Sequence, residues 1–213
     1  MIHKLTLISH SQEKDESRNM ILARIKYVYK LISLSVVIFL NITGHAMAYE
    51  EPDYKLIKTT DVYEIRQYED RLAVQTTQAA GQNGAFRRLF NYISGSNQSS
   101  SKIEMTVPVM QSDGSGGSVM LFFLPTSFTK QSAPLPKADN VELVTIKGGY
   151  YAVINYSGRS TNKNFKKHAT ILKDALNADN IVQTADPSMA TYNGPFTPFF
   201  LRRNEAMYRV QWK

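Results

Sequence analysis

Cysteine is absent from the 213-residue chain. Its absence excludes disulfide bridges, a lipid-modified cysteine, thiolate metal sites and covalent cofactor attachment through a C-x-x-C-H motif. Histidine is scarce as well, since three of the four histidines precede residue 49 and only His168 follows it. A metal site built from several histidines is therefore excluded from residues 49–213, and we expect no metal site of that kind.

The chain also lacks an uninterrupted apolar run of the roughly 20 residues that a membrane-spanning helix needs. Instead, three basic residues precede a shorter apolar segment, 31–40, and a small-x-small cleavage pattern ends at Ala48. This order is typical of a secretory signal peptide. We expect residues 1–48 to be removed and residues 49–213 to be exported, to the periplasm or the extracellular medium.

The N-terminal segment leaves two alternatives open. The residues before Met20 are polar, so Met20 is an alternative start of the signal peptide. An uncleaved segment would act as an N-terminal anchor, and it is the only part of the chain for which we expect membrane contact.

The known motifs of catalysis are missing from residues 49–213. There is no Ser-His-Asp arrangement with an elbow motif, no His-x-x-His pair and no phosphate-binding loop. The formal net charge of +7 is spread along the chain, which is weak support for nucleic-acid binding. We therefore predict a binding protein without catalytic residues and without a nucleic-acid partner, and its oligomeric state stays open.

The first half of the exported part alternates between strand-like and helix-like patterns. Residues 62–68 and 71–77 are strand-like, and Glu-Asp between them predicts the turn of a hairpin. Residues 81–95 place apolar side chains at helical spacing and end in a glycine typical of a helix C-terminus. Two further strands are predicted over 102–110 and 118–124, the second apolar on both faces.

The second half repeats this order. A second hairpin is predicted over 141–147 and 150–156, around a Gly-Gly turn. A helix over 160–179 begins at a Ser or Thr cap, and the last strands fall within 189–194 and 206–212.

Matching motifs at fixed offsets indicate a duplication. Phe86-Arg87-Arg88 recurs 79 residues later as Phe165-Lys166-Lys167, and Val62 recurs as Val141. The halves cover about 61–124 and 141–212, and each reads β-β-α-β-β. Each half is too small to bury its own sheet, so we expect an α+β fold in which both halves form one curved sheet or barrel.

Two stretches of sequence resemble a known family. "KIEMTVPVM" (102–110) and "YNGPFTPFFLRRNE" (192–205) are similar to the two signature stretches of the SOUL haem-binding protein family, and the resemblance covers about residues 54–213. It implies a distorted antiparallel β-barrel with two flanking helices. It also implies a SOUL-like domain over 49–213 that binds haem b or a related tetrapyrrole non-covalently, as a carrier, buffer or scavenger.

The resemblance further implies a haem cleft alongside the first helix. The apolar slot of that cleft would be formed by Phe86, Leu89, Phe90 and Ile93, and the propionate candidates are Arg87 and Arg88. Asn83 and Asn91 stand where the family has basic residues, which departs from its pattern. His168 is the candidate axial ligand, although a helix-border histidine bonded to a neighbouring group is the simpler interpretation.

Two other interpretations remain. The same fold without physiological haem binding would be a general apolar-ligand or protein-interaction module. In the segment 192–205, the prolines exclude a regular helix. There we predict that Arg202 and Arg203 brace the loop, by pairing with Glu205 or with backbone carbonyls.

Overall fold

The computed structural model describes residues 24, 26–30, 49–79, 83–114 and 116–213. Most of the predicted signal peptide lies outside these residues. The chain divides into two units, Met1–Ala48 and Tyr49–Lys213, and every described strand belongs to the second. Within the described residues, none of the helices combines the length and the apolar character needed to cross a bilayer.

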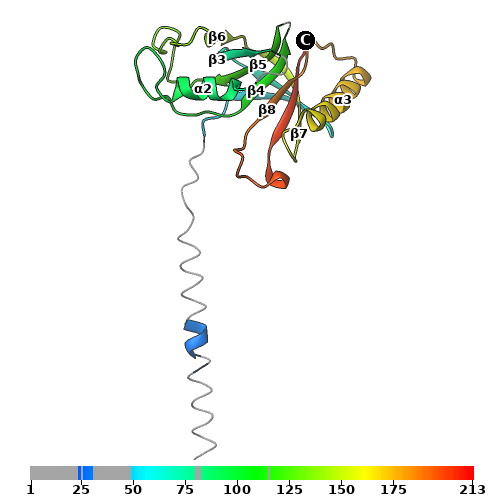
Figure 1. The fold of residues 1–213 in the computed structure, drawn as a ribbon. Helices are drawn as coiled ribbons and strands as arrows, with labels where there is room; N and C mark the ends of the chain where they lie inside the picture. Colours follow the sequence, from blue (N-terminus) through cyan, green and yellow to red (C-terminus); the bar gives the residue numbers. More distant parts are fainter. Residues whose placement is uncertain (1–23, 25, 31–48, 80–82, 115) are drawn as a thin grey trace, which may run out of the picture. The chain divides into compact units, whose positions relative to one another are not determined.

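Nine antiparallel strands form a single sheet that curls into a half-barrel (Figure 1). Their order across the sheet is β1-β2-β7-β9-β8-β4-β5-β3-β6. The strands are β1 Tyr54–Thr59, β2 Glu64–Tyr68, β3 Arg71–Gln78, β4 Val109–Gly114, β5 Gly117–Phe123, β6 Glu142–Ile146, β7 Gly149–Tyr156, β8 Ser188–Thr191 and β9 Asn204–Arg209.

The two predicted hairpins are wrong, because β2 does not pair with β3 and β6 does not pair with β7. Instead, β2 pairs with β7 and β3 pairs with β6. A two-residue hairpin turn favours Asn-Gly or Gly-containing pairs, which Glu69-Asp70 does not provide. Lys147-Gly148 does contain a glycine, so turn chemistry explains only the first of the two errors. The connections between these strands contact each other instead, as Gly148 N–H donates to Asp70 Oδ1 at 2.9 Å. A Cβ on Gly148 would lie 2.4 Å from the Tyr68 carbonyl oxygen, so this close approach requires glycine.

The pairing pattern reproduces the predicted repeat. The β2·β7 pair corresponds to β6·β3, β3·β5 to β7·β9, and β4·β5 to β8·β9, with the β4·β8 pair at the centre. The predicted α+β class with an antiparallel curved sheet is therefore confirmed. β1 lies outside the repeat and was not predicted.

The predicted strand over 102–110 begins only at Val109. Pro108 lacks a backbone N–H and cannot donate to a strand ladder, which explains why the regular pairing starts after it. The second signature stretch is likewise not a strand before Asn204. Its aromatic part forms a turn and the short 3-10 helix η1, Phe199–Leu201.

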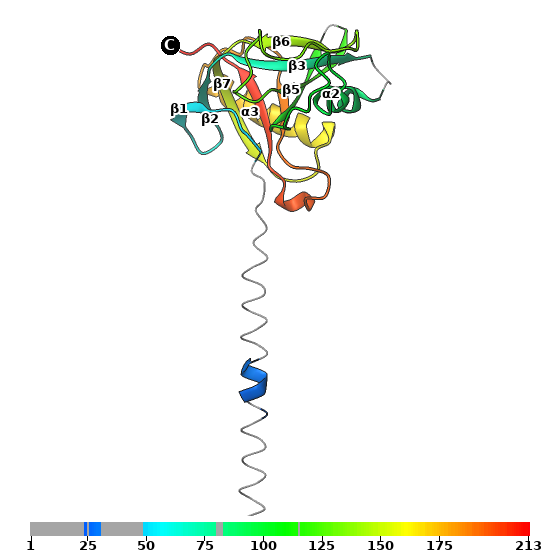
Figure 2. The same cartoon turned by 90° about the vertical axis from the view of Figure 1, so that its left-hand side faces the viewer.

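Two helices cover one face of the sheet near its two ends (Figures 1 and 2). α2, Ala85–Ile93, packs on β3 and β5, and α3, Asn162–Ala178, packs on β7 and β9. The predicted cap of α3 is confirmed, because the Thr161 hydroxyl accepts from the Asn164 N–H at 3.3 Å. The predicted glycine after the first helix is also confirmed, with Gly95 at a φ of 111°.

Each helix covers its own apolar core, and the opposite face of the sheet has a third cluster. Residues that are paired across neighbouring strands lie on the same face of the sheet. Successive pairs connect Val74, which lies beneath α2, to Tyr156, which lies beneath α3; the intermediate residues are Phe122, Val109, Thr191 and Asn204. Both helices therefore cover the same face. We call the other one the inner face, and its cluster includes Tyr68, Tyr192 and Met207.

Replacing Leu89 by alanine tests the role of α2 in the core. Leu89 is completely buried against β3 and β5, so Leu89→Ala is expected to lower the free energy of unfolding by about 2–5 kcal/mol. Arg87→Ala, on the exposed side of the same helix, should change it by less than about 0.5 kcal/mol. Urea unfolding of both variants measures the difference, and equal effects would contradict the packing described here.

Tyr156→Phe tests a buried hydroxyl in the α3 core. The Tyr156 hydroxyl has no hydrogen-bond partner within the described part of the chain, and burial raises its pKa to about 12. The folded state keeps this proton to a higher pH than the unfolded state, so stability falls as the pH rises from about 10 to 12. Tyr156→Phe should leave the free energy of unfolding at pH 7 unchanged or higher. Between about pH 10 and 12 the variant should lose up to about 2 kcal/mol less of this free energy than the parent chain.

Tyr92→Phe is the matched control, because burial raises the pKa of Tyr92 to about 12 as well. Its hydroxyl donates to the Pro134 carbonyl at 2.7 Å, so Tyr92→Phe should cost about 1 kcal/mol at pH 7. A comparable loss at pH 7 in Tyr156→Phe would show that its hydroxyl has a partner.

Candidate functional site

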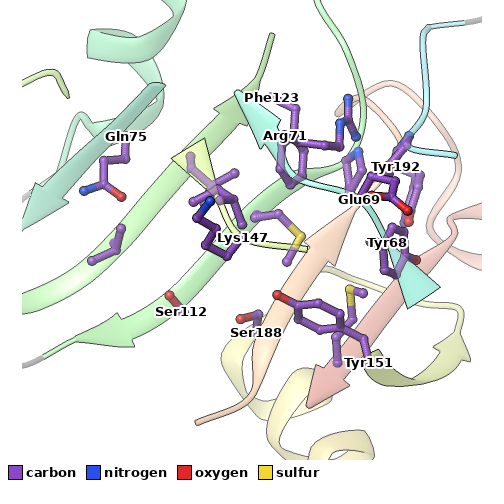
Figure 3. A pocket seen from close by; sticks show the side chains of 17 residues that line it. Tyr68, Glu69, Arg71, Gln75, Ser112, Phe123, Lys147, Tyr151, Ser188 and Tyr192 are labelled. Atoms are coloured by element: carbon purple, nitrogen blue, oxygen red, sulfur yellow. The ribbon is translucent and has the colours of Figure 1, made fainter. Parts of the chain in front are cut away.

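A cavity of about 260 Å³ opens on the inner face of the sheet (Figure 3). Its wall is mostly apolar and aromatic, with a few polar and charged groups toward the rim. We call it the inner cavity, and its lining residues are Pro52, Tyr68, Glu69, Arg71, Gln75, Pro108, Met110, Ser112, Val119, Leu121, Phe123, Ile146, Lys147, Tyr151, Ser188, Tyr192 and Met207.

The alternation of side chains along the strands builds the apolar wall. In β5, Leu121 points into the inner cavity while its neighbour Phe122 is buried beneath α2. This explains why 118–124 is apolar on both faces, as the sequence indicated. Met110 of β4 is the register partner of Leu121, so both side chains belong to the same wall.

A buried carboxylate lies beside the cavity on the inner face. Glu205 is fully buried, and its Oε1 accepts from Arg66 Nη1 at 3.1 Å and from Arg203 Nη2 at 3.1 Å. The Tyr192 hydroxyl donates to its other oxygen at 2.7 Å. Burial raises the pKa of Tyr192 far above its ordinary value, and the Glu205 carboxylate raises it further, so the phenol stays a neutral donor.

The two arginines of this network are held on several sides. Arg66 also pairs with Glu64 at 2.7 Å, and its guanidinium lies 4.4 Å from the ring centre of Tyr54. Arg203 lies 3.6 Å from the ring centre of Tyr192. The negative charge of the inner face is therefore neutralised by protein groups before any ligand is considered.

Arg71 differs from these two arginines. Its side chain is only 11% exposed, yet Nη1 and Nη2 are buried without a hydrogen-bond partner among the described residues. A buried donor left unpaired costs about 1–3 kcal/mol, and more when it is charged. Burial lowers the pKa of Arg71, while the nearby Glu50 and Asp53 carboxylates act in the opposite direction.

The other charged groups of the lining lie toward solvent. Lys147 pairs with Asp70 at 2.6 Å on an exposed stretch of chain, and Glu69 is exposed. Figure 3 shows Arg71 beside Phe123 on one side of the inner cavity and Tyr151 on another. Arg71 is thus the buried cation of the described lining.

The four predicted slot residues of α2 separate into two pairs. Leu89 and Ile93 are buried in the core between α2 and the sheet. Phe86 and Phe90 are each 48% exposed and stack on each other, with ring centres 6.0 Å apart. The described lining of the inner cavity includes none of the four, so α2 offers an exposed aromatic surface on the opposite face of the sheet.

The two predicted propionate candidates also differ. Arg87 is exposed on α2, close in sequence to Phe86 and Phe90. Arg88 folds back onto β3, where its Nε donates to the Thr76 hydroxyl at 3.0 Å and Nη2 to the Thr77 carbonyl at 3.3 Å. Of the two, Arg87 is the guanidinium that faces solvent beside the aromatic pair.

His168 lies on α3, on the helix-covered side of the sheet. Its Nδ1 is 2.8 Å from the Asn164 carbonyl oxygen, and its ring stacks on Tyr156 at 4.2 Å. The inner cavity is on the other face. No cluster of three or more His, Asp or Glu suited to a metal ion occurs among the described residues.

The loop between β8 and β9 is braced as predicted. Arg202 donates to the carbonyls of Thr197 at 2.8 Å and Pro195 at 2.7 Å, while Arg203 pairs with Glu205. Tyr192 of this loop is buried, but the phenylalanine side chains lie outside the core. Phe196 is 98% exposed, and the other exposed apolar side chains are Phe199, Phe200 and Leu201.

The sequence alone did not identify the inner cavity, since its wall combines residues from distant strands. Alternation in 118–124 indicated a strand buried on both faces, but not what the second face meets. Tyr151, Met207 and Arg71 come together only because of the strand exchange between the two halves. No local motif marks them.

Solved structures share this fold at low sequence identity. The crystal structure of the EcmrR C-terminal domain gives a TM-score of 0.54 at 9% identity, covering 75% of this chain and 99% of that one. A crystal structure of a hydrolase from Listeria innocua gives a TM-score of 0.52 at 7% identity, covering 72% of this chain and 94% of that one. Such likeness shows the fold alone.

Sequence comparison is more specific. No curated protein matches the chain. The family model described as SOUL heme-binding protein matches residues 49–209, which is most of the chain and includes both signature stretches. With the curled antiparallel sheet and its two helices in place, this match shows that the chain belongs to the SOUL haem-binding protein family.

Proposed function

We propose that this chain is an exported protein that binds haem or a related tetrapyrrole without covalent attachment, as a carrier, buffer or scavenger rather than an enzyme. Family membership supports a tetrapyrrole ligand. The single observation that supports a binding site is the inner cavity, an apolar hollow on the face of the sheet that neither α2 nor α3 covers. Apolar clefts with a few polar groups are typical of small-molecule sites.

The residues of the inner cavity fit such a ligand. A tetrapyrrole is a flat apolar ring with carboxylates on one edge, and Met110, Leu121 and Met207 offer an apolar wall for the ring. The volume of about 260 Å³ lies at the lower end of the roughly 300–1,000 Å³ of ligand pockets, so part of the ring would remain outside.

Haem, when bound, supplies an iron that accepts axial ligands such as His, Cys, Met or Tyr. The described lining contains neither histidine nor cysteine, whereas Tyr68, Tyr151 and the methionines are present. Affinity would then come mainly from apolar burial. Burying one large apolar side chain against the ligand contributes about 1.5–3 kcal/mol to the binding free energy, whereas an exposed ion pair contributes under about 1 kcal/mol.

The α2 surface predicted from the sequence is the competing location. Phe86 and Phe90 could cover one face of a ring, with Arg87 near a carboxylate. Phe86 and Phe90 are half-exposed, so a ring lying on them would keep its other face in water. For this reason we favour the inner cavity.

Haem titration of residues 49–213 and its variants separates the two locations. Leu121→Asp puts a charge on the cavity wall and is expected to weaken haem binding at least about tenfold, because the charge would have to be desolvated. Leu56→Asp, on the exposed strand β1, is the matched control and should bind like the parent chain. His168→Ala should leave the Soret band nearly unchanged, and each variant is checked for its melting temperature.

Other outcomes have distinct meanings. A large loss in Phe90→Ala, with Leu121→Asp unaffected, would place the ligand on α2. A large Soret change in His168→Ala would make that histidine the iron ligand. Absence of saturable binding at micromolar haem would contradict the proposed function.

That last outcome would favour the second candidate function, a general apolar-ligand or protein-interaction module. The exposed apolar side chains of the β8–β9 loop support it, because contiguous exposed apolar groups on a braced loop are typical of contact surfaces. Within the tetrapyrrole proposal, this loop has no assigned role.

Export is a separate part of the proposal. It is supported by the charged, apolar and small-x-small regions of 1–48, which occur in the order of a signal peptide. Mass spectrometry of the exported fraction from cells expressing the full chain should give a mature N-terminus at Tyr49. An intact N-terminus on a membrane-bound protein would favour the anchor instead.

A further inference from the structure

We infer that the inner cavity selects apolar molecules that carry a carboxylate, and that Arg71 is the residue that recognises this group. The inference rests on the inner cavity being the ligand site, as proposed above. It does not depend on the ligand being a tetrapyrrole. The same chemistry is shared by tetrapyrrole propionates and by fatty acids, and the experiment below distinguishes them.

The state of the Arg71 guanidinium is the first observation. Both terminal nitrogens are buried, and neither has a hydrogen-bond partner within the described residues. The nearest carboxylate oxygen is Glu50 Oε1, 3.9 Å from Nη2. At 3.9 Å the two form an ion pair but no hydrogen bond, so the N–H groups of Arg71 are left without an acceptor among the described residues.

The contact between Arg71 and the Phe123 ring is the second observation. The Arg71 guanidinium lies 4.2 Å from the ring centre of Phe123, which belongs to the same lining. An aromatic ring occupies the flat face of a guanidinium and leaves its N–H groups free, because those point outward in the plane. Such an edge matches the two oxygens of a carboxylate.

The remaining charges favour an anion over a cation. Glu205 is already neutralised by Arg66 and Arg203, so it is not available to a cationic ligand. Lys147 is paired with Asp70 on the exposed rim, and Glu69 is exposed there. The described lining therefore has one buried cation and no buried carboxylate, and Glu50 and Asp53, which act on Arg71, lie outside that lining.

The decisive experiment compares acids with their esters. Metal-free protoporphyrin and its dimethyl ester share one ring, and palmitic acid and its methyl ester share one chain. Binding to residues 49–213 is measured by porphyrin fluorescence and by calorimetry for the lipids. We expect each acid that binds to do so about ten- to a hundredfold more tightly than its ester, the range expected for hydrogen bonds to a charged group.

Variants of Arg71 assign this preference to one side chain. Arg71→Met keeps the length without the charge and should remove the preference for acids, while the ester binds as before. Its melting temperature should be unchanged or higher, because buried N–H donors without a hydrogen-bond partner among the described residues are removed. Arg71→Lys should keep part of the preference, and Arg159→Met, an exposed arginine outside the cavity lining, should keep all of it.

The possible results distinguish a failure of the Arg71 inference from a failure of the proposed function. Equal binding of porphyrin acid and ester to the parent chain would overturn the inference but leave the proposed function standing. Loss of the preference in Arg87→Met instead of Arg71→Met would move the carboxylate to α2 and also overturn it. Arg71-dependent binding of palmitic acid without any porphyrin binding would support the inference and contradict the proposed function.

Discussion

The exchange of strands β2 and β6 between the two halves is the constraint on which the rest of the structure depends. β2 pairs with β7 and β6 pairs with β3, so each half supplies a strand that the other half's sheet needs. Neither half can complete its sheet alone, and the nine strands curl as one. The same exchange brings Arg71, at the start of β3, to the same cavity as Tyr151 of β7.

The two faces of this sheet have different roles: one packs against the helices and the other carries the inner cavity. On one face the helices bury the apolar side chains that stabilise the fold, including two of the residues first assigned to a ligand slot, Leu89 and Ile93. The inner face is covered by neither α2 nor α3, and polar and charged side chains lie there among apolar ones. There Glu205 accepts hydrogen bonds from protein groups, whereas the terminal nitrogens of Arg71 have no hydrogen-bond partner among the described residues. That asymmetry gives the inner cavity its expected preference for an anionic, largely apolar ligand.

Local sequence patterns predicted both helices and most of the strands, but not which strands pair with each other. Helical spacing, the Thr161 cap and Gly95 placed both helices from the sequence, and the repeat predicted the two-part sheet. Pairing was mispredicted because adjacency along the chain favours hairpins, whereas the contact between the Asp70 and Gly148 connections favours exchange. The inner cavity depends on that exchange, so residues such as Arg71 carried no local signal. For the loop between β8 and β9 the sequence indicated the bracing by Arg202 and Arg203, but not that Phe196, Phe199 and Phe200 are exposed.

Mapping the ligand by NMR tests the central claim, that the inner cavity is the tetrapyrrole site, most directly. Metal-free protoporphyrin shifts nearby backbone amides through its ring current, and residues 49–213 are small enough for a ¹⁵N–¹H correlation spectrum. The largest shifts are predicted for β4, β5, β7 and β9 around Met110, Leu121, Tyr151 and Met207, with α2 nearly unchanged. Shifts concentrated on α2 around Phe86 and Phe90, with these strands unchanged, would contradict the account.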